Sequence, residues 1–397
     1  MCQSSRNPCV RCNCIQFKGL PGNRRSRTSG ESSRREERYY KDAFFIDKYY
    51  ISVGIGQSIY VFGKPAGVDI ARLPQVALLM FQPILLVVLR LFGLTLAGYL
   101  LFRIPIFRRR VLDPFVLLVL NVLFPLYFVH NFPAGWDAAV SVGWQWMAIF
   151  FGACFVLIGL QIVIGRYLVY HTGLFRTEHP RELISLFAIH NAGYLPLPIL
   201  AVFAPRSLMV YMFFFVLAFN LVFWTVAVSY MSGHGRLIFR ANVPLVGIFV
   251  GLLLAVFHLY HYAPEFVRVP IRFAGDLSMD LVLVALGGVL ATIPASDLRL
   301  RREFGSLVLL KLVLYPALVL VAMAFVPLRG LSPELAFGIR LGVVLQAAVP
   351  PATNLMIVAK AYGSEEQVRY VGSGIIVTYL ASLVTLPLFL FLSTVIY

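Results

Sequence analysis

The sequence HNAGYLPLP at residues 190–198 interrupts an apolar segment that runs from about residue 183 to about residue 203. A membrane helix of this length normally runs unbroken, but each proline removes a backbone N–H and clashes with the preceding turn. The glycine loosens the same turn. Backbone groups freed at membrane depth are tolerated only where protein or a water-filled cavity satisfies them. The stretch therefore predicts a broken membrane helix.

A second stretch of the same kind, QAAVPPATN, lies at residues 346–354. Each half of the chain thus has one interrupted apolar segment with an asparagine near its prolines. Paired interruptions of this kind are the best sequence pointer to the binding site of a secondary transporter. We therefore expect the two breaks to form one site.

The composition indicates a polytopic membrane protein. Of the 397 residues, 59% are hydrophobic and only 13% are charged, and the mean hydropathy is +0.82. In soluble domains about a quarter of the residues are charged. The net charge of +16 does not indicate nucleic-acid binding, because 13 of the 34 Lys and Arg residues lie in residues 1–75 and most others lie in short loops. Basic loops orient membrane helices.

The chain divides into a tail and two apolar halves. Residues 1–75 are polar and basic, so we expect a disordered tail, or a start codon assigned too far upstream. Residues 78–231 and 243–397 each hold five segments near the roughly 20 residues that a bilayer core requires. An odd number of helices in each half predicts an inverted repeat. The ten segments are 80–102, 112–131, 143–165, 183–203, 207–231, 243–262, 270–292, 307–327, 334–358 and 370–395.

Basic residues are distributed unevenly between alternate loops. The loops after odd-numbered segments hold 15 Lys and Arg residues, with Lys311 counted at the start of the eighth segment, and the other loops hold 4. The more basic loops face the cytoplasm. We therefore expect a multi-pass protein of the plasma or inner membrane with both termini outside.

Several motifs recur in a characteristic order along residues 78–397. They are LNVLFPL at 120–126, NAGYLPLP at 191–198, NVP at 242–244, LGGVL at 286–290, KLVLYP at 311–316, AVPPATN at 348–354 and AKAYG at 359–363. In these motifs the chain resembles the auxin efflux carrier family of membrane transport proteins, which includes plant PIN-type carriers and bacterial organic-acid permeases.

The resemblance implies an all-α fold of ten transmembrane helices, arranged as two inverted five-helix repeats whose broken helices 4 and 9 cross at the bilayer midplane. Helices 1, 2, 6 and 7 would form a scaffold that mediates homodimerisation. Helices 3–5 and 8–10 would form a moving transport domain, with elevator-type alternating access as the mechanism.

The resemblance also implies site residues. The crossover prolines of the family correspond to Pro196 and Pro350, with Pro351 beside them, and its substrate-contacting asparagines correspond to Asn191 and Asn354. An asparagine donates and accepts hydrogen bonds, so each amide could hold a carboxylate or tie up the broken backbone. Further candidates for substrate binding are Thr353 and Gln346.

Three ionisable residues inside the apolar segments are also candidates. His190 stands where the family has small or apolar residues; it is a possible carrier of a coupled proton, or a neutral histidine hydrogen-bonded within the bundle. Arg90 is expected to pair with Asp276 or Asp280. Arg340 either has a function, as charges in the membrane commonly do, or reaches the outer interface.

These observations predict a secondary transporter of small organic anions, such as malate-like or auxin-like carboxylates, with a proton or Na⁺ as the possible coupled ion. The alternative is a membrane sensor that binds a small ligand at the same pocket without transport. No HExxH, phosphate-binding loop or Ser-His-Asp arrangement is present, so we expect no enzyme activity, no cofactor and no metal site. His258 and His261 are interpreted as ordinary interfacial residues.

Overall fold

The structure is a computed structural model that describes residues 50–53, 57–60, 73–172, 175, 177–232, 243–293 and 301–397. The chain divides into two compact units, residues 1–48 and 49–397, and every described residue lies in the second. Most of the tail expected at residues 1–75 therefore lies outside the described residues. Within it the structure has an antiparallel hairpin of β1 (Tyr50–Val53) and β2 (Gln57–Tyr60), with Tyr50 opposite Tyr60.

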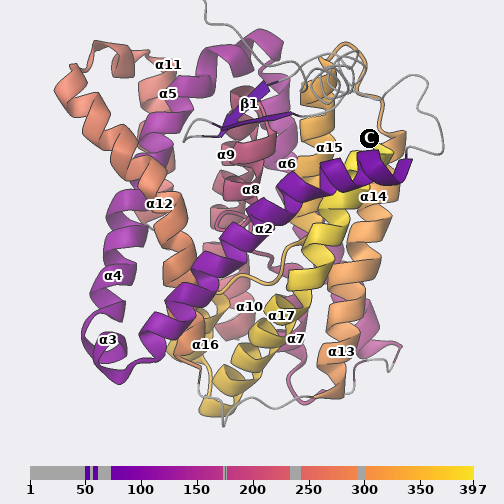
Figure 1. The fold of residues 1–397 in the computed structure, drawn as a ribbon. Coiled ribbons are helices and arrows are strands. Elements are labelled where there is room, and N and C mark those ends of the chain that lie inside the picture. Colours follow the sequence, from indigo (N-terminus) through magenta and orange to yellow (C-terminus); the bar gives the residue numbers. More distant parts are fainter. Residues whose placement is uncertain are drawn as a thin grey trace, which may run out of the picture. The chain divides into compact units, whose positions relative to one another are not determined.

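From Leu73 onward the described chain is helical (Figure 1). The helices of the first half are α2 (Leu73–Arg103), α3 (Pro105–Arg110), α4 (Leu112–Leu118), α5 (Phe124–Val142), α6 (Gln145–Tyr170), α7 (Pro180–Ala188), α8 (Pro196–Phe203), α9 (Arg206–Val222) and α10 (Val228–Ser232). Those of the second half are α11 (Val243–Val256), α12 (Glu265–Ala291), α13 (Arg302–Val308), α14 (Tyr315–Phe325), α15 (Pro333–Ala348), α16 (Leu355–Tyr362) and α17 (Glu365–Ile396).

Wider π-helical turns connect some of these helices. They are η2 (Val119–Leu123) between α4 and α5, η3 (Phe223–Ala227) between α9 and α10, and η6 (Leu309–Leu314) between α13 and α14. Pro125 and Pro316 follow η2 and η6 closely. Because proline has no N–H for the carbonyl four residues earlier, the ladder of helical hydrogen bonds opens at this point.

Within the described residues, seven continuous helical stretches are long and apolar enough to cross a membrane. They lie in α2, α4–α5, α6, α9–α10, α12, α13–α14 and α17. The other apolar segments are the 14-residue α11 and the two broken pairs, α7 with α8 and α15 with α16. The chain is therefore an integral, multi-pass membrane protein.

The helices pack in two groups (Figure 1). In the first group α12 packs on both α2 and α5, and α5 also packs on α11; in the second, α6–α9 pack with α13–α17 through several contacts. The groups meet mainly where α5 contacts α9 and where α2 contacts α17. The first group contains the helices expected for the scaffold, and the second contains those expected for the transport domain.

An ion pair joins α2 and α12 in the first group. Arg90 Nη2 lies 2.7 and 2.8 Å from the two carboxylate oxygens of Asp280. The expected pairing of Arg90 is therefore confirmed with Asp280, whereas Asp276 lies 3.8 Å from Arg272. Arg90 thus belongs to the contact between two scaffold helices and not to the breaks.

Glycines allow the backbones of α2 and α12 to approach closely. A Cβ atom at Gly98 would overlap the backbone of Val284, and one at Gly287 would overlap the carbonyl of Thr95. Small residues at helix contacts are typical of membrane proteins, where packing replaces the hydrophobic effect between helices.

We expect the substitution Gly98→Ala to lower the thermal stability of the purified protein, because the added methyl group would push the two backbones apart at a cost of about 1–3 kcal/mol. Gly93→Ala in the same helix is the matched control, since nothing lies within 4 Å of its Cβ position. Tm measured in detergent tests this. Equal Tm values for the two variants would show that α2 and α12 do not depend on this close approach.

Candidate functional site

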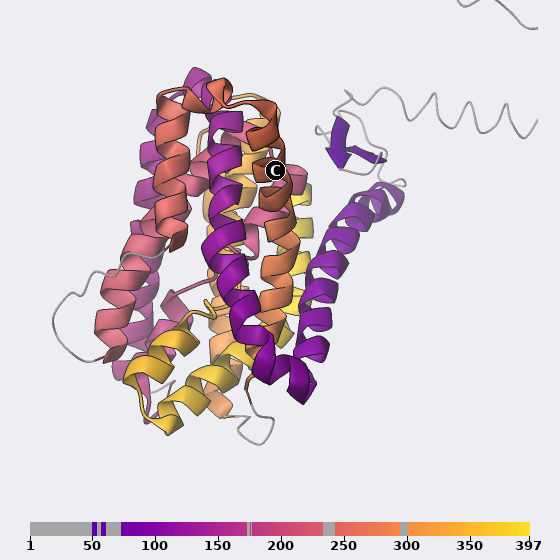
Figure 2. The same ribbon diagram turned by 90° about the vertical axis from the view of Figure 1, so that its left-hand side faces the viewer.

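The two breaks meet in a short antiparallel bridge between His190 and Pro351. α7 ends at Ala188 and α8 begins at Pro196, while α15 ends at Ala348 and α16 begins at Leu355. Between these half-helices the backbones run antiparallel, and the extended stretches lie partway along the long helices in both views (Figures 1 and 2). Positions 190 and 350 are 160 residues apart in the sequence, yet the two interruptions meet in one place.

Backbone hydrogen bonds across the crossing satisfy the groups that the breaks release. The Asn191 N–H donates to the Pro350 carbonyl at 2.9 Å, and the Ala352 N–H donates to the Ile189 carbonyl at 3.0 Å. Buried backbone groups without partners are costly in a membrane, where water is absent. Each break therefore stabilises the other.

The prolines set the geometry of this crossing. Pro196 is the first residue of α8, where a missing N–H removes no helical hydrogen bond. Pro350 supplies the carbonyl that accepts from Asn191, and Pro351 lies opposite His190 in the antiparallel bridge. All three prolines are buried.

The two asparagines differ in their surroundings. Asn191 is buried; its Nδ2 donates to the Tyr379 hydroxyl of α17 at 2.7 Å, and its Oδ1 accepts from the Tyr194 N–H at 3.0 Å. Asn354 is half-buried at the start of α16, beside the Tyr194 hydroxyl. Asn191 thus ties the first break to α17, while the more exposed Asn354 is better placed to meet a ligand.

Gln346 and Thr353 are both buried at the crossing. The Gln346 Nε2 donates to the Ala192 carbonyl at 3.0 Å, which joins the last turn of α15 to the other break. The Gln346 Oε1 has no hydrogen-bond partner among the described residues. The Thr353 carbonyl accepts from the Met356 N–H at 2.9 Å and so helps to start α16.

His190 is buried against aromatic rings of α9. Its ring centroid lies 5.8 Å from that of Phe215 and 5.6 Å from that of Phe219. Neither His190 ring nitrogen makes a hydrogen bond to a described residue, so both interpretations of this histidine stay predictions. Gln346 and the Ala188 carbonyl are neighbours of the ring, but neither meets hydrogen-bond geometry.

Sequence reasoning missed Lys311. This residue was counted as a loop charge, but it lies within η6 with no exposed surface. Its Nζ donates to the Phe187 carbonyl at 2.6 Å and lies 6.0 Å from the centroid of the Phe187 ring. In the part of the chain that the structure describes, no carboxylate lies within ion-pair distance of it. A lysine inside an apolar segment was itself the available signal, since charges there are costly and usually functional.

The position of Lys311 gives it an electrostatic role at the crossing. Phe187 is the next-to-last residue of α7, where helical carbonyls lack N–H partners and carry partial negative charge. The ammonium group therefore caps the C-terminal end of this half-helix. Correcting the loop count from 15 to 14 leaves the uneven distribution of basic residues unchanged.

The N–H groups in the first turn of α16 donate hydrogen bonds to nearby backbone carbonyls. Those of Leu355, Met356 and Ile357 donate to the carbonyls three residues earlier, at 3.1, 2.9 and 3.0 Å. Free N–H groups at the start of a helix attract anions. These three groups of α16 are occupied by backbone carbonyls, whereas Lys311 places a basic group beside the breaks.

Arg340 lies at the ends of other helices. Its Nη2 donates to the Val326 carbonyl, just after α14, at 3.2 Å, and its guanidinium lies 5.3 Å from the ring centroid of the C-terminal Tyr397. The side chain therefore reaches the end of α14 and the last residue after α17, away from the breaks.

A cavity in the structure lies away from the crossing of the two breaks. This cavity of about 370 Å³ lies at the starting ends of α13 and α17, and none of the predicted site residues lines it. Its lining residues are Arg301, Phe304, Glu365, Glu366, Arg369, Tyr370 and Ser373.

The hydrogen bond between Asn191 and Tyr379 is expected to stabilise the crossing. Asn191→Ala and Tyr379→Phe should each lower the free energy of unfolding by about 1–3 kcal/mol, because each leaves a buried polar group without its partner. The double variant should lose less than the sum of the two. Tm values of the four proteins test this; strict additivity would mean that the two side chains do not interact.

Residues 236–390 match a family model described as a membrane transport protein family. This is the family that includes the auxin efflux carriers and PIN-like permeases, so the resemblance drawn from the motifs is confirmed over this part of the chain. The match covers α11 to α16 and most of α17, and hence the second break. No curated protein sequence matches the chain.

Proposed function

From the match of its second half to the membrane transport protein family, we propose that this membrane transporter is a secondary carrier of small organic anions. The observation that carries the choice of an anion is the buried ammonium group of Lys311, which lies beside the crossing of two broken helices.

A buried charge is costly unless a partner of opposite sign or several polar groups compensate it. An ammonium group has three N–H donors, and the Phe187 carbonyl accepts from one of them. Because no described carboxylate pairs with Lys311, a carboxylate substrate at the crossing would supply the missing charge. In this proposal the positive charge of Lys311 is neutralised only when a carboxylate substrate is bound at the crossing.

Two polar groups near the crossing fit the rest of such a substrate. The Gln346 Oε1 accepts a hydrogen bond from a hydroxyl or a protonated group, and the half-buried Asn354 amide both donates and accepts. Small hydroxy-acids and auxin-like acids both combine a carboxylate with such a donor. Buried Pro196, Pro350, Pro351 and Thr353 would shape the walls.

For the mechanism we propose elevator-type alternating access in a homodimer. The division of the helices into two internally packed groups supports a scaffold of α2, α5, α11 and α12 and a moving domain that carries both breaks. In this proposal the two five-helix halves are inverted repeats, and both termini lie outside the plasma or inner membrane.

Lys311 also bears on the coupled ion. In carriers with broken helices, the C-terminal ends of half-helices are places where Na⁺ binds. Here the ammonium group already occupies the carbonyl end of α7. We therefore propose that transport needs no Na⁺, and that a proton gradient or the membrane potential, worth about 2.3 kcal/mol per charge per 100 mV, supplies the energy.

Uptake into proteoliposomes tests this proposal. A panel of labelled mono- and dicarboxylates should include at least one that accumulates, with equal rates in Na⁺ and K⁺ buffers. Lys311→Met should reduce its uptake at least tenfold, because the positive charge is lost. Lys360→Met, at the exposed end of α16, is the control and should transport normally. Absence of uptake for every carboxylate under every gradient would refute the proposed function.

The role of His190 is tested separately. If it carries the coupled proton, His190→Gln should abolish the dependence of uptake on an imposed pH gradient while leaving uptake driven by the membrane potential. Retention of the full pH-gradient effect would assign the ring to packing against Phe215 and Phe219 alone.

A further inference from the structure

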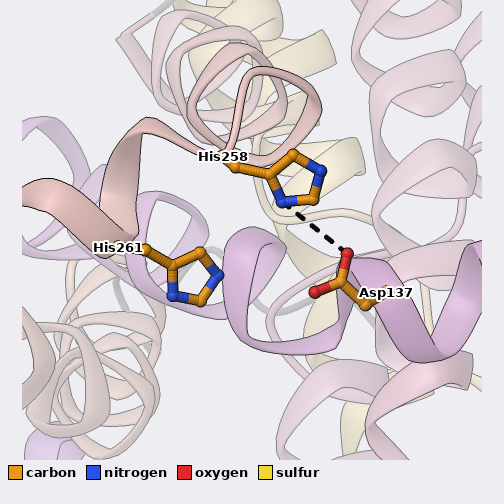
Figure 3. A group of neighbouring side chains, drawn as sticks. All are labelled: Asp137, His258 and His261. Carbon is orange, nitrogen blue, oxygen red and sulfur yellow. Dashed lines mark ion pairs between the residues drawn. The ribbon is translucent and has the colours of Figure 1, made fainter.

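Two histidines and an aspartate converge at one end of the scaffold group. Figure 3 shows their side chains. Asp137 lies near the end of α5, His258 follows α11, and His261 lies in the short helix η4 (Leu259–Tyr262). Their potential ligand atoms all lie within 4.8 Å of one another. About 120 residues separate Asp137 from the two histidines in the sequence, so the fold alone brings them together.

The side chains face a common space. The His258 Nδ1 lies 3.8 Å from the Asp137 Oδ1, and the two imidazole rings are nearly parallel at 23° with centroids 6.3 Å apart (Figure 3). The residues are exposed, with 54% of the His258 side chain and 68% of the Asp137 side chain accessible. Solvent can therefore reach this space and occupy further coordination positions.

The backbone holds His258 in an unusual conformation. Its φ is 54°, and among the described residues it is the only one other than glycine with a positive φ. This conformation is uncommon for a residue with a side chain, and histidine is among the residues that adopt it more often. Here it ends α11 and directs the imidazole toward α5, while the His261 N–H donates to the His258 carbonyl at 3.3 Å.

A neighbouring contact fixes the loop against α5. The Tyr260 hydroxyl, between the two histidines in the sequence, lies 2.9 Å from the His130 Nδ1 of α5. Tyr260 is buried, and α5 packs closely on α11. The three candidate ligands therefore project from a rigid frame and need only small rotations of exposed side chains to approach one centre.

We propose that Asp137, His258 and His261 bind a divalent transition-metal ion of the Zn²⁺ class and clip the end of α5 to the α11–α12 connection. Two imidazoles and one carboxylate form a common set of zinc ligands, with water at the open position. The ligand atoms would move by about 1 Å or less to reach Zn–N and Zn–O distances near 2.0–2.2 Å. This site replaces the interpretation of His258 and His261 as ordinary interfacial residues.

The clip is separate from the transport site. Phe124, which lies beside Gly193 of the first break, is 13 residues before Asp137 along α5, or about 20 Å of helical rise. Both anchoring elements belong to the scaffold group, so the ion stabilises the scaffold and is not a transported cargo.

A second cluster of possible ligands fits a metal ion less well. It consists of Glu178, His179 and Glu366. The Arg301 guanidinium lies 3.5 Å from Glu366 and already supplies a positive charge there. One imidazole with two carboxylates is also the weaker set for Zn²⁺.

Metal binding to the full chain, purified without a histidine tag and with accessible cysteines alkylated, tests the proposal without any transport assay. ZnCl₂ titrated calorimetrically should bind the wild-type protein at one site and raise its Tm. His258→Ala, His261→Ala and Asp137→Asn should each weaken binding at least tenfold. His171→Ala, an exposed histidine at the end of α6, is the matched control and should bind normally.

A fluorescence measurement locates the ion. Ni²⁺ should quench Trp136, the neighbour of Asp137, and the quenching should disappear in His258→Ala and shrink in Trp136→Phe. The metal-free Tm of each variant should equal that of the wild type, which excludes misfolding. The proposal is overturned if the Zn²⁺ affinity of the His258→Ala, His261→Ala double variant equals that of the wild type, or if His171→Ala has the same effect.

Discussion

The structure depends on one constraint: backbone groups released at membrane depth must find partners within the protein. Two helices are broken by proline, and neither break could persist alone. The hydrogen bonds between Asn191 and Pro350, and between Ala352 and Ile189, make each break the partner of the other. Asn191 and Gln346 extend this network with their side chains to α17 and across the crossing. The irregular backbone is therefore a rigid feature built on fixed contacts.

Charge at the crossing follows from the same geometry. A broken helix exposes carbonyls at its C-terminal end, and the end of α7 receives the Lys311 ammonium. The first-turn N–H groups of α16 bond within their own turn, so helix starts contribute less to anion attraction than Lys311 does. This basic side chain beside the two half-helix junctions is the observation on which the proposal of an anionic substrate rests.

The remaining polar residues divide between the two packed groups. Arg90 and Asp280 join scaffold helices, and Asp137, His258 and His261 lie at one end of the same group. The second group, α6–α9 with α13–α17, carries the breaks, Lys311 and His190. Contacts that hold the scaffold are thereby kept apart from the residues that would meet the substrate. This separation is what a carrier needs if one group moves while the other stays fixed in the membrane.

The sequence by itself determined the membrane class, the positions of the apolar segments and the two breaks. These properties are local: apolar runs, prolines and glycine act through their own backbone, whatever lies around them. The tertiary structure alone decided which side chains meet. Asn191 donates a hydrogen bond to the Tyr379 hydroxyl, and Lys311 donates one to the Phe187 carbonyl, because packing brings distant helices together. Lys311 was counted with the loop charges because it lies near the start of the eighth apolar segment, and hydropathy does not reveal which face of a helix is buried. His258 and Asp137 also lie close together only because packing brings distant parts of the chain side by side.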